Sequence, residues 1–262
     1  MTITALREKG PLIHNLTNEV VSNFTANGLY AIGASPVMSK APEEAADMAG
    51  ISDGVLINIG TLTASDVEAM HLAGRRANEN GIPVVLDPVG VAATAYRKET
   101  CRDLLQAISF TAIRGNAGEI ATLIDRPWEA RGVDSSDDGD VVELAEAAAI
   151  KLGTLIILTG KKDVVTDGTR TYTCENGTPM LTKVTGTGCL LSSVVTAFLT
   201  LDGDRVDNAV SAVSTYGVAS ELAVDDAAGP GTFHPRFLDT LSTVTLEAVQ
   251  QHAVVKEVVH ND

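Results

Sequence analysis

The sequence predicts an α/β protein with a mostly parallel central sheet and helices on both faces. Short apolar segments of β type alternate with alanine-rich segments of helical pattern along most of the chain. The segments VLINI, PVVLD and TLIIL are apolar at nearly every position, as expected for strands that are buried on both faces. The length of 262 residues suits one large α/β unit, so we expect a single domain over residues 1–262.

The elements follow in order from apolar periodicity and turn residues. The predicted strands cover residues 12–14, 36–38, 55–59, 83–86, 111–113 and 155–158, followed by a hairpin over 163–174. The predicted helices cover residues 18–32, 42–48, 64–80, 96–107, 117–124, 140–152, 189–201, 205–224 and 233–250. Residues 131–139 are polar and rich in turn formers, which predicts an exposed loop, and residues 256–262 are expected to fray. Parallel sheets bind ligands beyond the carboxyl ends of their strands, so functional residues are expected at that edge.

Charge and cysteine content exclude several kinds of partner. Nineteen basic and 34 acidic residues give a net charge of −15, which would repel nucleic acid and anionic membrane surfaces. Three cysteines without CxxC spacing predict neither a disulfide framework nor a structural zinc site. The segment MTITALREKGPLIHNLTNEVV has no signal-peptide core, and no segment approaches the ~20 apolar residues of a membrane helix. We therefore expect a cytoplasmic protein.

The segment KVTGTGCLLSS is the most informative motif. Gly186, Thr187 and Gly188 precede the predicted helix, so their backbone N–H groups and that of Cys189 would face one concavity at the positive helix end. Such an anion hole can cradle a phosphate or stabilise a transferring phosphoryl group. The motif is neither a Walker A loop nor a GxGxxG fingerprint. The alternative interpretation is a helix start whose glycines serve only a tight turn.

Cys189 is the predicted catalytic residue. It opens the predicted helix, where the helix dipole is expected to lower the pKa of a thiol. It could act as a weak general base or remain a neutral group that hydrogen-bonds a substrate hydroxyl. The alternative is a small apolar filler at a crowded helix start. Cys101 and Cys174 lack this setting and are interpreted as packing or surface residues.

Polar residues also follow three predicted strands. Asp87, in VVLDPVGVAA, suits a Mg²⁺ ion held through water and phosphate oxygens. In IRGNAGEI, Arg114 can neutralise phosphate charge, while Asn116 and Glu119 could support the metal. Thr159, in LTGKKDVVTDG, could hold a nucleotide triphosphate through its hydroxyl. Each could instead be a helix cap or a hairpin turn; function is favoured because these segments and the glycine motif share one predicted edge.

The segment HNLTNEVVSNFTANGLYAIGASPVM combines asparagines with apolar residues. Asn15, Asn18, Asn23 and Asn27 are predicted to lie on a helix, where asparagine is a poor helix former and therefore indicates hydrogen-bonding roles. Caps and helix–helix hydrogen bonds are the alternative. Asn23 is assigned to substrate binding. Met38, at a predicted strand end, could line a small apolar pocket or simply belong to the core.

Together these segments resemble the hydroxyethylthiazole kinase family of the ribokinase-like superfamily. The resemblance runs from NLTNEVVSNFTANGLYAIGASPVM through DPVGVAAT, IRGNAGEI and TDG to VTGTGCLLSS, nearly the whole chain. It implies a three-layer ribokinase-like fold and transfer of the ATP γ-phosphate, with Mg²⁺, to the hydroxyl of 5-(2-hydroxyethyl)-4-methylthiazole in thiamine salvage or biosynthesis. It also implies a homotrimer with the thiazole bound near a subunit interface.

The resemblance also implies roles by position. Met38 and Gly186 match substrate contacts, and Arg114 and Thr159 match ATP contacts. The acidic groups near Mg²⁺ are matched in the same way by two residues of this chain, Asp87 and Glu119.

Two positions depart from related patterns. Cys189 stands where many sugar kinases of the superfamily carry a catalytic Asp; Cys is usual in thiazole kinases, and it limits strong general-base catalysis. Positioning, Mg²⁺ and the anion hole could then carry most of the rate. Ala92 replaces the usual Gly of DPVGVGAT, and activity is expected to survive this change.

Two other functions fit the same residues. One is a related kinase for the hydroxymethylpyrimidine precursor or another vitamin alcohol. The other is a non-kinase ATP-binding protein of ribokinase-like fold, such as a repair enzyme of the hydratase type or a non-catalytic sensor.

Overall fold

The structure is a computed structural model that describes residues 2–128 and 138–259. Over these residues one sheet has the strand order β2-β1-β3-β4-β5-β6-β7-β8-β9. The strands are β1 (Leu12–Leu16), β2 (Ser35–Val37), β3 (Gly54–Asn58), β4 (Val84–Asp87), β5 (Ala112–Asn116), β6 (Leu155–Thr159), β7 (Asp163–Thr166), β8 (Thr171–Cys174) and β9 (Val255–Glu257). Strands β1 to β6 pair in parallel, and β7, β8 and β9 pair antiparallel at one end. This sheet confirms the predicted α/β class.

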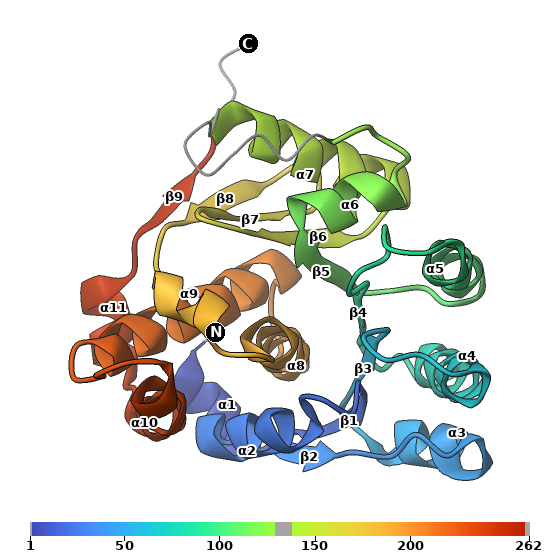
Figure 1. The fold of residues 1–262 in the computed structure, drawn as a ribbon, viewed down its shortest axis with the longest axis horizontal. Coiled ribbons are helices and arrows are strands. Elements are labelled where there is room, and N and C mark those ends of the chain that lie inside the picture. Colours follow the sequence, from blue (N-terminus) through green and yellow to red (C-terminus); the bar gives the residue numbers. More distant parts are fainter. Residues whose placement is uncertain (1, 129–137, 260–262) are drawn as a thin grey trace.

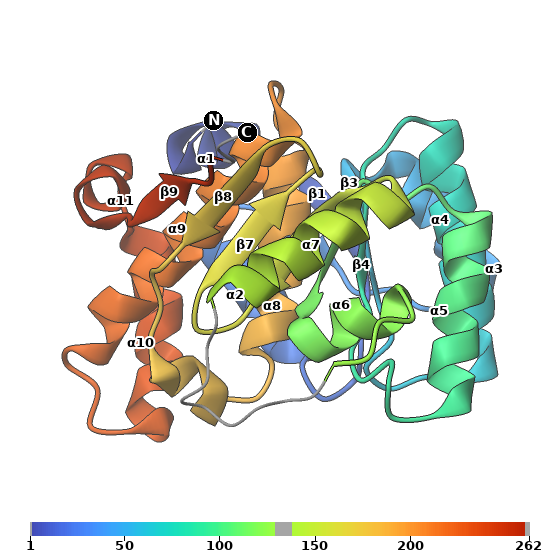
Figure 2. The ribbon, with the colours of Figure 1, turned by 90° about the horizontal axis from the view of Figure 1, so that it is seen from above.

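Helices cover both faces of the sheet. They are α1 (Ile3–Lys9), α2 (Ser22–Ile32), α3 (Pro42–Ile51), α4 (Ala64–Glu79), α5 (Ala95–Ala107), α6 (Ala117–Leu123), α7 (Asp138–Leu152), α8 (Thr187–Leu199), α9 (Arg205–Val224), α10 (Pro230–Thr243) and α11 (Leu246–His252), with a 3₁₀ helix η1 (Pro179–Lys183). The sheet curves around α8 and α9, while α3, α4 and α5 stand on its outer side (Figure 1). Figure 2 shows these three helices side by side at one end of the molecule. No helix among the described residues is both long and apolar enough to cross a membrane.

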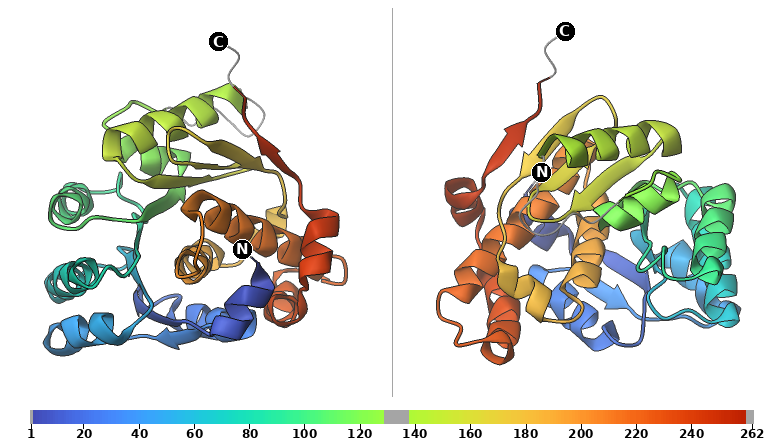
Figure 3. Two further views of the ribbon diagram at one scale, coloured as in Figure 1. Left: turned by 180° about the vertical axis from the view of Figure 1, so that it is seen from behind. Right: turned by 45° about the horizontal axis from the view of Figure 1, so that its top comes forward.

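Two apolar cores lie on the two faces of the sheet. The first joins the inner face of the sheet to α8, α9, α10 and the N-terminal helices, and the second joins the outer face to α3 through α7. Helix α8 is buried along almost its whole length, including Leu190 and Phe198. A helix that is apolar all round must be enclosed, which explains its place inside the curve of the sheet, also visible from behind in Figure 3. The helix that carries the glycine motif is therefore packed against the strands.

Several predicted boundaries are wrong. Asn15 lies in β1, and Asn18 lies in a turn before α2, whose first residue is Ser22, so the helix proposed at 18–32 starts too early. Helix α8 begins at Thr187, which makes Cys189 its third residue and not its first.

Other elements were missed by the sequence patterns. The helix predicted at 233–250 is two helices, because the chain turns at Val244 and the Thr245 side chain caps α11. Strand β9 pairs with β8, so residues 256 and 257 are not frayed; residues 260–262 lie outside the described part of the chain. Helices α1 and η1 were not predicted either. The predicted loop at 131–139 also lies outside the described residues, apart from its last two positions, which belong to α7.

Candidate active site

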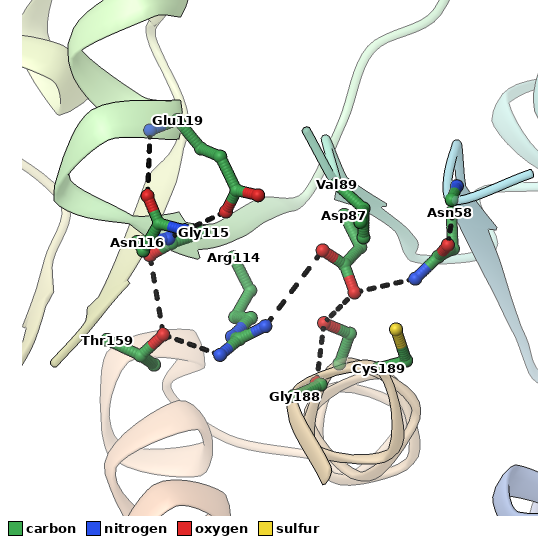
Figure 4. Close-up of polar contacts among 12 residues, drawn as sticks. Asn58, Asp87, Val89, Arg114, Gly115, Asn116, Glu119, Thr159, Gly188 and Cys189 are labelled. Atoms are coloured by element: carbon green, nitrogen blue, oxygen red, sulfur yellow. Dashed lines mark hydrogen bonds and ion pairs between the residues drawn. The ribbon is translucent and has the colours of Figure 1, made fainter. Parts of the chain in front are cut away.

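The carboxyl edge of the parallel strands gathers polar side chains in one row. In the strand register, Asn58 at the end of β3 lies opposite Asp87 at the end of β4. Two strands further on, Asn116 at the end of β5 lies opposite Thr159 at the end of β6. Parallel strands end on the same side of a sheet, so four consecutive strands place these residues together. The N-terminus of α8 faces them (Figure 4).

Asp87 is the buried carboxylate at the centre of this row. Its Oδ2 atom accepts hydrogen bonds from Asn58 Nδ2 at 2.7 Å and from Ser192 Oγ at 2.8 Å. Its Oδ1 atom is buried, has no hydrogen-bond donor among the described residues, and lies 4.0 Å from Arg114 Nη1. Burial raises the pKa of Asp87 to about 6, and the nearby Glu119 carboxylate adds to this, while Arg114 opposes it. The site therefore contains a buried carboxylate oxygen that accepts no hydrogen bond among the described residues and has the Arg114 guanidinium as its charged neighbour.

Arg114 joins Asp87 to the end of β6. Its Nη2 atom donates to Thr159 Oγ1 at 2.6 Å, and its Nε atom is buried without an acceptor among the described residues. A Cβ atom on Gly188 would lie 2.8 Å from Arg114 Nη1, so the absence of a side chain at Gly188 lets the guanidinium approach the helix start. The predicted ATP-binding pair Arg114 and Thr159 is thus one hydrogen-bonded unit beside the glycine motif.

The start of α8 has the backbone geometry of an anion-binding helix end. Gly186 is the N-cap, with φ 94° and ψ −5°, and a Cβ atom there would lie 2.7 Å from Val21 Cγ1. Glycine adopts this left-handed conformation without strain. Leu190 N–H donates to the Gly186 carbonyl at 2.8 Å and closes the first helical turn. The N–H groups of the three preceding residues therefore have no acceptor within the helix, and they point to its N-terminal side.

Cys189 lies in this first turn, and its pKa differs from the expectation. Burial raises the pKa of the thiol to about 11, with a further rise from Asp87. The predicted lowering by the helix dipole is therefore wrong, because loss of solvent around the sulfur outweighs it. Asn18 Nδ2 donates to Cys189 Sγ at 3.5 Å. A thiol with this pKa is protonated at pH 7, which suits a neutral hydrogen-bonding group better than a base.

Glu119 is tied into the loops of the site. It forms a capping box with Asn116, in which Asn116 Oδ1 accepts from Glu119 N–H and Glu119 Oε2 accepts from Asn116 N–H, both at 2.9 Å. Its Oε1 atom accepts from Gly90 N–H at 2.9 Å, which connects α6 to the loop after Asp87. The capping alternative for Asn116 is thus present. A carboxylate has further lone pairs beyond these bonds, so Glu119 can still accept from a metal-bound water.

The donor set fits Mg²⁺ that is bound together with phosphate. Among the described residues, no group of three or more His, Cys, Asp and Glu side chains gathers into a metal cage. Mg²⁺ commonly keeps several waters and uses one or two carboxylates with substrate phosphates. Asp87, whose Oδ1 accepts no hydrogen bond among the described residues, and the neighbouring Glu119 meet that requirement.

Two predicted substrate residues lie away from this network. Asn23 is exposed on α2, and its side-chain and backbone oxygens accept hydrogen bonds from Asn27 at 3.0 and 2.9 Å. Met38 lies one residue past β2 and is half-buried, so it is not at the end of the strand itself. Neither belongs to the contacts drawn in Figure 4.

Two residues of the network, Asn58 and Ser192, were missed, while the hydrogen-bonding role predicted for Asn18 is confirmed. Asn18 Nδ2 donates to Asn58 Oδ1 at 3.1 Å, Asn58 donates to Asp87, and Ser192 donates to Asp87 from α8. The available signal was the single polar residue that ends the apolar segment VLIN, because a buried amide needs partners. The serines after Cys189 carried no such signal, since serine is common in helices near their start.

The fold, with a glycine-started helix facing the carboxyl edge of its parallel strands, is that of the ribokinase-like class of kinases. This chain belongs to the hydroxyethylthiazole kinase family, whose sequence pattern it matches over residues 3–247. It is accordingly a kinase that phosphorylates the hydroxyl of the thiazole alcohol, as the sequence resemblance implied.

Solved structures agree with this assignment. The chain is 38% identical to a hydroxyethylthiazole kinase protein from Pyrococcus horikoshii OT3, with a TM-score of 0.91 over 98% of this chain and 97% of that one. A ribokinase-like superfamily protein from Enterococcus faecalis V583 shares the fold at 13% identity, with a TM-score of 0.66 over 92% of this chain and 88% of that one. A pyridoxal kinase from Staphylococcus aureus in complex with ADP has 14% identity and a TM-score of 0.64 over 94% of this chain and 98% of that one. The last two likenesses concern the fold alone.

Proposed function

We propose that the enzyme transfers the γ-phosphoryl group of Mg-ATP to the primary hydroxyl of 5-(2-hydroxyethyl)-4-methylthiazole at the edge formed by β3 to β6. The observation that carries this proposal is that the buried Asp87 carboxylate, the Arg114 guanidinium and the N-terminus of α8 lie next to one another. The hydroxyl oxygen forms the new bond to phosphorus, the bond to the β-phosphate oxygen breaks, and ADP leaves. A transition state of this kind needs positioning and charge stabilisation more than covalent help.

Each group of the site has a role in this reaction. Arg114 and Thr159 bind the phosphates of ATP, and the charged guanidinium offsets their negative charge. The anion hole from Gly186 to Cys189 receives the equatorial oxygens of the transferring group through backbone N–H donors.

The metal role falls on the two acidic residues. Asp87 and Glu119 would hold Mg²⁺ directly or through water, and the ion would neutralise charge on the phosphate oxygens. Asn58 and Ser192 hold Oδ2 of the Asp87 carboxylate, which leaves Oδ1 buried beside Arg114 and without a hydrogen-bond donor among the described residues.

Substrate binding and assembly are part of the same proposal. We assign Met38, Gly186 and Asn23 to the thiazole site near a subunit interface of a homotrimer. Support comes from the exposed position of Asn23 and from two large apolar side chains in and just before the same helix, Val20 at 69% and Tyr30 at 65% exposure. A second copy that covers this face would bury them. Light scattering of the purified protein should give three times the chain mass, and a monomeric mass at working concentration would contradict the assembly.

The remaining assignments concern the whole chain. We propose one kinase domain over residues 1–262, supported by the single sheet and by helices from both halves of the chain around α8. A cytoplasmic location is proposed from the use of ATP and from three free cysteines, of which Cys101 and Cys174 are buried as packing residues.

Two variants of Cys189 separate its possible roles. Because the thiol is protonated at pH 7, Cys189→Ala is expected to lower kcat by less than about 100-fold, the lower end of what a general base contributes. Cys189→Asp introduces a group that can accept the hydroxyl proton, so its kcat should equal or exceed that of the wild type. Steady-state kinetics at pH 7.5 measures both. A Cys189→Asp variant no more active than Cys189→Ala would exclude a useful base at this position.

The substrate assignment is tested by direct turnover. Purified enzyme with Mg-ATP is incubated with the thiazole alcohol, with 4-amino-5-hydroxymethyl-2-methylpyrimidine or with neither, and ADP and phosphorylated product are measured. We expect product from the thiazole alcohol and only background ADP in the other two samples. Product from the pyrimidine alcohol alone would show that the substrate assignment is wrong.

A further inference from the structure

Tyr216 of α9 contacts the glycine motif at the start of the neighbouring helix α8. Its side chain is buried at 3% exposure, and its ring meets Phe237 edge-on, with centroids 4.9 Å apart and planes at 89°. Phe237 in turn stacks on Phe233 at 5.5 Å. The Tyr216 hydroxyl donates to the backbone carbonyl of Thr187 at 2.6 Å. Burial raises the pKa of the phenol well above its ordinary value, so it remains a donor.

The bonded carbonyl belongs to the peptide group of the anion hole. The Thr187 C=O and the Gly188 N–H are the two ends of one planar trans peptide, in which they point in opposite directions. A donor that holds the carbonyl end therefore also sets the direction of the N–H end. The same hydrogen bond polarises the peptide and makes its N–H a stronger donor.

Thr187 is held from a second element as well. Its Oγ1 atom donates to the carbonyls of Leu181 at 2.8 Å and Val184 at 3.3 Å, in and just after η1. The side chain of Thr187 is thus fixed by η1 and its carbonyl by α9. The next residue, Gly188, has no side chain that could fix its own peptide, so the orientation depends on these outside contacts.

We propose that Tyr216 is a positioning residue for phosphoryl transfer, which aims and polarises the Gly188 N–H toward the transferring phosphoryl group. Tyr216 does not touch the substrates; it acts through the 187–188 peptide. This inference rests on the proposed function, since it requires that the Gly186–Cys189 amides receive the phosphoryl oxygens.

The variant Tyr216→Phe tests this role. It keeps the ring and its contact with Phe237, and the Thr187 carbonyl keeps its place in the helical ladder, so the fold is expected to persist. We expect kcat to fall about tenfold, with KM for ATP and for the thiazole alcohol changed less than about threefold, because the lost donor acts mainly on charge in the transition state. Tyr172→Phe is the matched control: its hydroxyl accepts from Arg170 Nη2 at 2.9 Å on β8, and kcat should not change.

A binding measurement provides the readout that a merely structural role would not change. With the thiazole alcohol present, binding of Mg-ADP with aluminium fluoride, which imitates the transferring group, should weaken by the same factor as kcat in Tyr216→Phe, while Mg-ATP binding stays constant. A wild-type kcat in Tyr216→Phe would overturn the proposal. The proposal would also be overturned if kcat fell, Mg-ATP binding weakened by the same factor and the melting temperature fell as well, because general damage to the fold would then explain the loss. If the wild type itself forms no thiazole phosphate, it is the proposed function that fails.

Discussion

Replacing Asp87 by Asn is expected to lower kcat by about 100-fold or more, because it removes the charged ligand that would hold Mg²⁺ at the phosphates. The apparent affinity for Mg²⁺ should fall further than KM for the thiazole alcohol rises. Magnesium titrations of the initial rate measure the first quantity, and thiazole titrations at saturating Mg-ATP measure the second. If thiazole affinity is lost while Mg²⁺ dependence is unchanged, Asp87 does not belong to the metal site.

The Asp87→Asn variant is expected to lose activity but not stability, because it removes a buried charge. In the folded protein the pKa of Asp87 is about 6, above the ordinary value of about 3.9. Between these two values the folded state binds more protons than the unfolded state, so the free energy of unfolding falls as pH rises from about 4 to about 6, by roughly 3 kcal/mol from this group. Asn cannot ionise, and its oxygen can still accept from Asn58 or Ser192.

Thermal melts without Mg²⁺ should therefore show Asp87→Asn to be at least as stable as the wild type at pH 7.5, with the difference reduced at pH 4. Asp163, which also has a pKa raised to about 6 by burial, is present in both proteins and cancels in the comparison. Asp66→Asn is the activity control: this carboxylate is also largely buried, pairs with Lys40 at 3.2 Å, and lies outside the site. A loss of kcat in Asp66→Asn as large as that in Asp87→Asn would mean that removal of a buried charge, and not the metal site, causes the effect.

Replacing Gly188 by Ala should also abolish most activity without unfolding the protein. The added methyl group would lie 2.8 Å from Arg114 Nη1 and 3.2 Å from Nη2, so the guanidinium must shift from its place, which disturbs its hydrogen bond to Thr159. Because Arg114 is proposed to bind the phosphates of ATP, KM for ATP should rise about tenfold or more, and kcat/KM should fall about 100-fold. Stability should be unchanged or slightly higher, since Ala is favoured over Gly in helices by up to ~1 kcal/mol.

Gly231→Ala is the matched control for this variant. Gly231 is the second residue of α10, as Gly188 is of α8, but a Cβ atom there meets nothing within 4 Å. Its kinetics should equal those of the wild type. Both variants are compared by their KM for ATP, their kcat/KM and their melting temperatures. A fully active Gly188→Ala would show that the close approach of Arg114 to Gly188 is dispensable.

The candidate site was predictable to the extent that it depends on strand ends. Asp87 and Thr159 end their strands, so the parallel topology brings them to one edge. Arg114 was predicted to follow its strand but lies in the middle of β5, and its long side chain reaches Thr159. Gly186 and Gly188 predict a helix start from the local sequence alone. Gly186 has a φ of 94°, a left-handed backbone conformation that favours glycine at this position.

Other features of the site needed long-range contacts. The carboxylate of Asp87 and its donor Ser192 are 105 residues apart, and the amide of Asn18 reaches the sulfur of Cys189 across 171 residues. Burial of the Cys189 thiol comes from the same assembly, and for this reason its pKa rises although the helix start predicted the opposite. A local pattern carries no information on how much solvent remains around a side chain.

The amino-acid sequence by itself determined the α/β class, the apolar strands and the glycine-started helix, because backbone hydrogen bonding and apolar periodicity act over a few neighbouring residues. Only the tertiary structure decided that Asn18 and Asn58 connect Cys189 to Asp87, that Ser192 donates to the same carboxylate, and that Tyr216 holds the first peptide of α8. These contacts join residues from different strands and helices, and their geometry is set by how those elements pack around α8.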